Sequence, residues 1–249
     1  MIDTRDIEDI RERVDGYWRR TLAENGVDFI DIALGKEGGH QLSDRVDQLT
    51  TSFIHSSFPM CSGFQHTGGK ANSRSMGDIW FKNRREEWNP VNVKTGLVGS
   101  EGQPNIVSLK RVMSSIFERK IDSYYLLFVK FAVDPARKSI AHRVWLVDLL
   151  DWITLSGRRS VVTFNAGPGQ MMLKAERFFG LLDRGFAPDS ATLREKVSAL
   201  MDLYLLGERN LMRDRRRDRE KFKLSYEKFI DDSRPFAIDA ERQKEFEIR

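Results

Sequence analysis

Apolar residues in the first sixty positions recur every three or four places, which predicts two amphipathic helices. The first helix begins after Thr4, a suitable N-cap, and its apolar positions are Ile7, Ile10, Val14, Trp18 and Leu22. Asn25-Gly26 is expected to end it. The second helix starts near Ser43 and carries on one side Leu42, Val46, Leu49 and Phe53.

After these helices the pattern changes to short β-prone runs. The stretch 61–77 is polar and glycine-rich, which predicts a loop. Residues 78–81 and 91–95 are β-prone and flank a charged turn, so we expect them to form an antiparallel hairpin.

The remaining patterns complete an alternation of helices and strands. Residues 105–120 show helical periodicity, with Asn105 as a candidate N-cap. Apolar runs at 123–133 and 143–150 predict strands that are buried on both faces. The order helix, strand, strand, helix, strand, strand predicts an α/β fold whose central mixed β-sheet is flanked by helices.

The chain is expected to form a single domain over 1–249, with a mainly helical C-terminal region at about 173–249. In that region Thr192 and Glu195 have the T-x-x-E spacing of a capping box, which predicts the start of a helix.

Composition narrows the class of protein. Hydrophobic residues make up 40% and charged residues 31%, which is typical of a globular chain. The single cysteine, Cys61, excludes an internal disulfide and a cysteine-rich zinc site. No apolar run approaches the ~20 residues that cross a bilayer, and the charged N-terminus does not resemble a signal peptide, so we expect a cytoplasmic protein without a membrane partner.

Charge and motif spacing exclude further classes. The net charge is +4, and Arg209 to Lys223 holds eight basic against three acidic residues. This segment suits a polyanionic partner or a solvated helix face held by ion pairs. The histidines lack zinc-hydrolase spacing, and no glycine-rich motif at a strand-to-helix junction predicts a nucleotide cofactor.

Three polar residues of the predicted hairpin form the candidate catalytic centre. Asn92 and Lys94 lie two apart on one strand, so they project from one face, while Val91 and Val93 project into the core. Pairing of the two strands brings Asp78 beside them.

Oxygen atoms of this set suit a hard divalent cation. Mg²⁺ is held in proteins by one or two carboxylates together with other oxygens and waters. Asp78, Asn92 and the backbone carbonyl of Val93 are the candidate ligands. Lys94 is expected to orient the attacking water and to neutralise developing charge. Such a centre predicts phosphodiester hydrolysis.

The D-x13-N-x-K pattern of Asp78, Asn92 and Lys94 resembles the PD-(D/E)XK signature of type II restriction endonucleases, over roughly residues 40–150. Asn92 stands where the signature usually has an acid. The resemblance implies a restriction-endonuclease-like core, sequence-specific Mg²⁺-dependent cleavage of double-stranded DNA within a restriction-modification system, and a homodimer. In this superfamily a preceding helix sometimes adds an acid to the metal site, and the candidates are Glu37 and Asp44.

Polar residues near this centre and in two loops are the candidates for DNA binding. Asn105 also suits helix capping, and Lys110 also suits an ordinary surface position. Loops that enter the major groove read guanine with Arg or Lys and adenine with Asn or Gln. The DNA-binding candidates are Gln103, Asn105, Lys110, Lys70, Arg74, Arg158, Arg159, Asn165 and Gln170.

Other readings of the same residues remain open. Asp78 is also suited to cap a strand while Lys94 lines a solvated edge. A structure-selective or repair nuclease of the same superfamily shares all these features. Asn92 also suits a DNA-binding protein whose active site has decayed.

Overall fold

We describe a computed structural model of the chain, which defines residues 4–35, 38–58, 61–63, 76–82, 88–98 and 105–231. By its internal contacts the chain divides into two units, Met1–Gly207 and Glu208–Arg249, and each is described by itself. The single domain expected over the whole chain stays a prediction.

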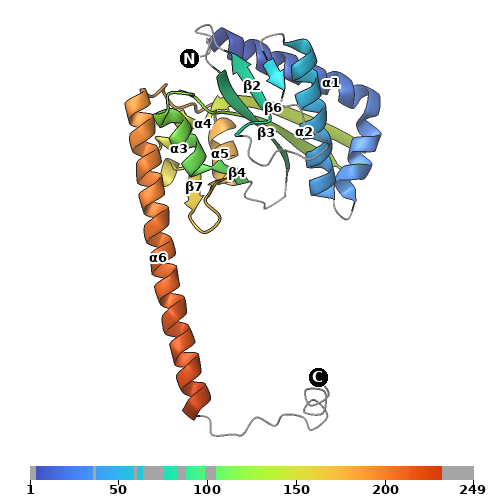
Figure 1. Ribbon diagram of the computed structural model, residues 1–249. Helices are drawn as coiled ribbons and strands as arrows, with labels where there is room; N and C mark the ends of the chain where they lie inside the picture. The colour runs from blue at the N-terminus through green and yellow to red at the C-terminus, as the bar shows by residue number, and fades with distance from the viewer. Residues whose placement is uncertain are drawn as a thin grey trace, which may run out of the picture. The chain divides into compact units, whose positions relative to one another are not determined.

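Two helices form the first layer of the larger unit. They are α1 (Thr4–Leu34) and α2 (Gly38–Ser57). Asn25 lies at a non-helical kink inside α1, so the predicted break is present but the helix continues to Leu34. α2 begins five residues before Ser43, at Gly38. Both helices lie against the same face of the central sheet (Figure 1).

The central sheet has five strands in the order β1-β2-β3-β5-β6. The β3–β5 pair is parallel and the other pairs are antiparallel, so the sheet is mixed. The strands are β1 (Cys61–Gly63), β2 (Ile79–Lys82), β3 (Trp88–Leu97), β5 (Tyr125–Asp134) and β6 (Ser139–Asp148).

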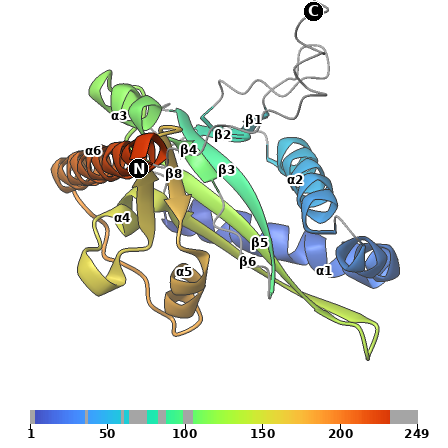
Figure 2. The ribbon, with the colours of Figure 1, turned by 90° about the horizontal axis from the view of Figure 1, so that it is seen from below.

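A second layer covers the other face of the central sheet (Figure 2). It contains a smaller antiparallel sheet in the order β4-β8-β7, with strands β4 (Asn105–Ser108), β7 (Val162–Asn165) and β8 (Gln170–Leu173). Its helical elements are α3 (Leu109–Phe117), α4 (Leu149–Ile153), the short 3-10 helix Gly157–Arg159, α5 (Ala175–Leu182) and the first part of α6 (Leu193–Asp231).

Alternation along β5 explains why the central sheet carries a core on each face. Leu127 and Val129 pack with α1 and α2, whereas Leu126 and Phe128 pack with the second layer. Successive strand residues point to opposite faces, so a continuous apolar run is required where both faces are covered. The prediction of burial on both faces is confirmed for β5.

Two details of the sequence prediction are wrong. The strand predicted over 143–150 ends at Asp148, where α4 begins; within it Val144 and Leu146 pack with the layer of α1 and α2, and Trp145 and Val147 pack against the second layer. The helix expected from residue 105 begins at Leu109, because residues 105–108 pair with β8 as a strand. Asn105 therefore does not cap it; Ser108 occupies the N-cap position.

The coarse fold is confirmed: the protein is α/β, with a mixed sheet flanked by helices and a C-terminal helix. The capping box is also present, since the Thr192 backbone N–H donates to Glu195 (2.8 Å) and the Glu195 N–H donates to the Thr192 hydroxyl (3.3 Å). Within the described residues, no helix combines the length and apolar character needed to cross a membrane.

Candidate metal centre at the edge of β3

The predicted hairpin forms, and its pairing stops at the candidate site. β2 and β3 pair from Lys82↔Trp88 to Ile79↔Val91. The next residue of the β2 segment, Asp78, still donates its backbone N–H to the Val91 carbonyl (2.9 Å). Asp78 therefore lies one residue past the last strand pair, with its backbone bound to Val91 of β3.

Beyond the last pair, the carboxylate of Asp78 supplies the hydrogen-bond acceptor that the next residue of a strand would have supplied. Its Oδ2 accepts the backbone N–H of Val93 at 2.8 Å. The N–H and C=O of one strand residue face the same side, so the Val93 carbonyl faces the side on which Asp78 lies. This geometry is compatible with the predicted role of that carbonyl as a ligand.

Gly77 allows the chain to approach β3 so closely. A Cβ at this position would lie 2.9 Å from both Pro90 Cβ and the Val91 carbonyl oxygen. Any side chain would therefore push the segment away from the strand, and Asp78 with it.

Asn92 is buried, with 8% of its surface exposed, on the face of β3 opposite Val91 and Val93. Its Nδ2 donates to the Ile106 carbonyl (3.0 Å) and to the Tyr124 hydroxyl (3.1 Å). A carbonyl only accepts, so the nitrogen must face Ile106 and the orientation of the amide is fixed. The Asn92 Oδ1 atom is buried and has no hydrogen-bond partner among the described residues.

One tyrosine hydroxyl joins the two segments that carry the candidate ligands. Tyr124 Oη donates to the carbonyl of Met76 (2.7 Å), two residues before Asp78, and accepts from Asn92. Burial raises the pKa of Tyr124 far above its ordinary value, so this hydroxyl stays protonated. Tyr124 thus acts as a neutral clamp, and the sequence prediction missed it.

A buried cluster of charged residues, Asp148, Asp151 and Lys196, binds the backbone of Tyr124. Asp148 Oδ1 accepts the Tyr124 backbone N–H (3.2 Å), and its Oδ2 accepts from Lys196 of α6 (2.6 Å). Lys196, which is 4% exposed, also contacts Asp151 (3.1 Å). Burial alone would lower the pKa of Lys196, but the two carboxylates, Asp148 foremost, reverse this and raise it. The lysine is therefore charged and locks the start of α6 to the sheet.

α2 contributes an acid, Asp47, which the sequence could not single out from its neighbours. Asp47 Oδ1 accepts the hydroxyl of Thr95, next to Lys94, at 2.8 Å. Burial raises the pKa of Asp47 to about 7; the charges of Asp78 and Asp44 raise it too, while Thr95 and Lys94 act in the opposite direction. Asp47, Asp78 and Lys94 thus lie close enough to influence one another electrostatically.

Lys94 itself is partly buried. Among the residues that the structure defines, none forms an ion pair or hydrogen bond with it. Within the described residues its ammonium therefore has no hydrogen-bond or ion-pair partner, which suits a group that would contact a phosphate or an attacking water.

The donor atoms at this edge fit a hard cation that keeps much of its water. Within the described ranges, no three His, Cys, Asp or Glu side chains gather as a metal-binding group. An ion here would rely on Asp78, the orphaned Asn92 Oδ1 and the Val93 carbonyl, all oxygen donors. Mg²⁺ is commonly bound by one or two carboxylates plus waters, so this set suits it.

The remaining predicted residues occupy several places. Asp44 is exposed on α2, one turn before Asp47. Lys110 lies in the first turn of α3, with its Nζ 5.6 Å from the Tyr204 ring centre. Asn165 and Gln170 face each other across the β7–β8 hairpin, whereas Arg158 and Arg159 lie beyond its other end. Outside the described residues are Glu37, Lys70, Arg74 and Gln103.

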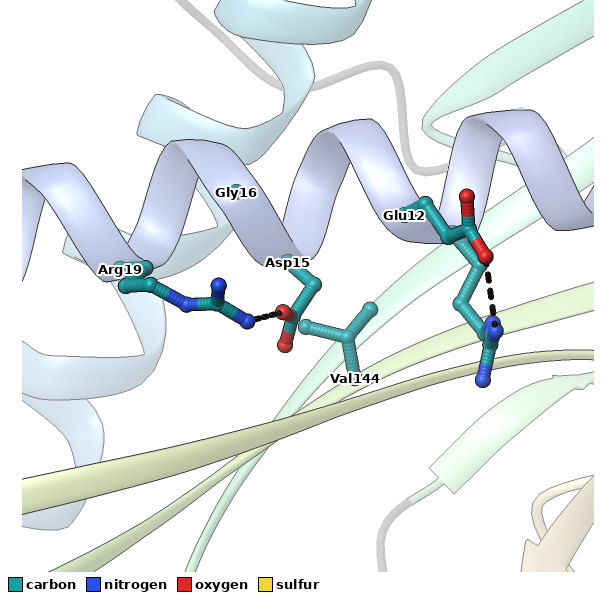
Figure 3. A pocket seen from close by; sticks show the side chains of 6 residues that line it. Glu12, Asp15, Gly16, Arg19 and Val144 are labelled. Atoms are coloured by element: carbon teal, nitrogen blue, oxygen red, sulfur yellow. Dashed lines mark hydrogen bonds and ion pairs between the residues drawn. The ribbon is translucent and has the colours of Figure 1, made fainter.

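An open pocket lies elsewhere, between α1 and β6 (Figure 3). Its volume is about 470 Å³, and ion pairs such as Arg19–Asp15 (2.8 Å) occupy its wall. None of the candidate ligands lines it. The pocket therefore does not add to the candidate centre.

Comparison with known proteins gave no assignment. No protein-family model matches the chain, and a search of curated proteins found no significant match.

Proposed function

We propose that this protein is a Mg²⁺-dependent endonuclease that hydrolyses phosphodiester bonds in double-stranded DNA, with the restriction-endonuclease-like fold and sequence-specific action of a type II restriction enzyme. The observation that carries the proposal is the edge of β3 just past the Ile79↔Val91 pair: Asp78 accepts the Val93 N–H there, and the buried Oδ1 of Asn92 has no partner in the described structure. A buried acceptor without a partner costs about 1–3 kcal/mol, so such an atom calls for a functional explanation.

Each residue has a distinct part in the proposed chemistry. A bound Mg²⁺ would polarise a phosphate oxygen and lower the pKa of a coordinated water. Asp78, Asn92 and the Val93 carbonyl would hold the ion, and Tyr124 fixes Asn92. Lys94 orients the water and neutralises the charge that develops on the phosphate. Burial raises the pKa of Asp47 to about 7, so Asp47 adds negative charge to this site, in which an amide replaces the usual acid, when it releases its proton.

The test is incubation of the protein with phage DNA and Mg²⁺, followed by electrophoresis. Discrete fragments support the restriction activity. A smear, or a preference for branched or damaged DNA, supports the repair-type nuclease. Tight binding with intact DNA at every protein concentration supports the decayed binding protein and overturns the proposal.

A pair of lysine variants controls this test. Lys94→Ala is expected to lower the cleavage rate by at least about 100-fold while leaving DNA binding intact. Lys120→Ala, which removes an exposed lysine paired with Glu118, should cleave like the wild type. Equal activity of the two variants would remove Lys94 from the mechanism.

The homodimer is part of the proposal, since a two-fold symmetric protein matches a palindromic DNA site. The second unit offers a surface for it: Met212, Phe222, Leu224 and Tyr226 of α6 are all more than half exposed. Phe222 and Tyr226, four residues apart, lie on the same side of the helix, and exposed apolar surface is typical of protein interfaces. Light scattering should give the mass of a dimer, and Phe222→Glu should shift it towards the monomer.

A further inference from the structure

The outer face of the small sheet carries side chains that are uncharged and mostly polar. Its inner face packs into the core through Val162, Phe164, Met171 and Leu173. Residues directly opposite each other in paired strands share a face, and successive residues alternate. The outer face is therefore formed by Asn105, Ser108, Thr163, Asn165, Gln170 and Met172.

None of these six side chains is charged, although 31% of the chain is. All six are partly or fully exposed. Among the described residues, their side-chain polar groups are not fully used in hydrogen bonds to other side chains. The face thus offers amide and hydroxyl donors and acceptors together with the methyl groups of Thr163 and Met172. Such a surface suits a ligand that is recognised by its hydrogen-bonding pattern rather than by its charge.

The candidate metal centre touches this sheet directly. Asn92 Nδ2 donates to the carbonyl of Ile106, which lies on β4 between Asn105 and Ser108. Neighbouring strands lie about 4.8 Å apart and each strand residue rises about 3.3 Å, so Gln170, opposite Ser108, lies roughly 8 Å and Asn165 roughly 12 Å from that contact. The major groove of DNA is about 12 Å wide, so a duplex gripped at the centre spans the face.

The hairpin that carries Asn165 and Gln170 has a slender tip. Gly167 and Gly169 lie in its turn, and Gly169 has a φ of +71°, a conformation that favours glycine. A Cβ at Gly169 would meet nothing within 4 Å, and the Gly169 carbonyl accepts the backbone N–H of Leu109 (3.3 Å), which holds the tip against the start of α3. β-Strands of DNA-binding proteins can lie in the major groove, where side chains from one face reach the base edges.

We propose that this face, formed by the β7–β8 hairpin and β4, reads A·T base pairs in the major groove of the DNA substrate; the proposal rests on the endonuclease function above. Asn and Gln make paired hydrogen bonds with adenine, and small apolar groups such as those of Thr163 and Met172 pack against the thymine methyl. The commonest guanine contact requires Arg or Lys, and this face has neither.

The experiment selects sequences from duplexes with a randomised central segment, in Mg²⁺, and recovers cleaved and bound molecules separately. Wild type should yield a preferred sequence that contains A·T pairs. Asn165→Ala and Gln170→Ala should each lose about 10- to 100-fold of the preference at one or two of those pairs, with the rest unchanged. Gln41→Ala, the same substitution as at Gln170 but at an exposed position of α2, is the matched control and should keep the whole preference.

The outcomes separate this inference from the proposed function. Cleavage with a preference that both hairpin variants retain overturns base reading and leaves the endonuclease intact. Sequence-selective binding without cleavage overturns the hydrolytic function, and loss of that selectivity in the hairpin variants still supports base reading. A wild type that neither binds nor cleaves any duplex overturns both.

Discussion

Two strand pairs of the central sheet differ in how far their ladders extend. β5 and β6 pair without interruption from Tyr125↔Asp148 to Asp134↔Ser139. β2 and β3 pair over four residues, after which a carboxylate accepts the Val93 N–H. Buried backbone N–H and C=O groups need hydrogen-bond partners. In a complete ladder the groups that face the neighbouring strand are all paired with it. An interrupted ladder leaves backbone and side-chain oxygens that a ligand can use.

The same difference appears in what lies buried. Around β5 the core is aliphatic and aromatic, with Leu127 and Val129 fully buried. Beside β3 the protein buries Asn92 and holds it through Tyr124. Polar groups in a low-dielectric interior are costly unless bonded, so this clamp is expected to serve position rather than stability. Four predictions test the contrast.

The largest effect is expected at the interrupted ladder. Asp78→Asn keeps an oxygen that accepts the Val93 N–H but removes the charge that attracts a cation. We expect cleavage to fall by at least about 100-fold while the free energy of unfolding changes by less than about 1 kcal/mol. Plasmid cleavage and denaturant unfolding measure the two. A large loss of stability instead would show that the carboxylate is mainly structural.

A substitution in β5, which belongs to the complete β5–β6 ladder, should lower stability and leave the metal requirement unchanged. Leu127→Ala removes a fully buried side chain beneath α1 and α2 and is expected to cost about 2–5 kcal/mol of unfolding free energy. The Mg²⁺ concentration for half-maximal cleavage by the folded fraction should not change. A clear shift of that concentration would mean that the core of β5 controls the metal site.

The clamp should show a smaller, mixed effect. Tyr124→Phe leaves Met76 O without its donor and Asn92 Nδ2 with one acceptor, so unfolding should become about 1–3 kcal/mol easier. The Mg²⁺ concentration for half-maximal cleavage should rise, because Asn92 is no longer fixed.

Thr50→Val is the matched control for this clamp. It removes the buried hydroxyl that accepts from Trp18 Nε1 (3.1 Å), on the other side of the sheet. This variant should lose comparable stability with an unchanged Mg²⁺ requirement. The same requirement in Tyr124→Phe and wild type would reduce Tyr124 to a packing residue.

The smallest effect concerns Asp47 and pH. Its folded-state pKa of about 7 lies above the ordinary value of 3.8, so the native state holds a proton that the unfolded chain has released. Stability from this group therefore falls as the pH rises through 7. Between about pH 6 and about pH 8 the loss is about 1.4 kcal/mol.

The measurement is denaturant unfolding of wild type and Asp47→Asn without divalent ions. The variant should lack that part of the pH dependence, whereas Asp44→Asn, on the exposed side of the same helix, should keep most of it, because the Asp44 charge is the smallest contribution to the raised pKa. Parallel pH profiles for wild type and Asp47→Asn would contradict the raised pKa.

Local patterns in the sequence determined much of this protein. Three- and four-residue periodicity predicted α1 and α2, and the T-x-x-E box predicted the start of α6. Alternation correctly assigned Val91 and Val93 to the core and thereby Asn92 and Lys94 to the opposite face. These features depend on neighbours within one turn or one strand, which is why the chain alone reveals them.

Tertiary structure decided the rest. Residues 105–108 became a strand because β8, more than sixty positions later, supplies its partner, and helical periodicity carries no trace of that pairing. Only packing brings Tyr124 to Asn92, and only packing selects Asp47 among the acids of its helix. Contacts between distant segments form because apolar surfaces bury one another away from water. The relative positions of the candidate site residues therefore depend on how the layers pack, and no single segment of the sequence determines them.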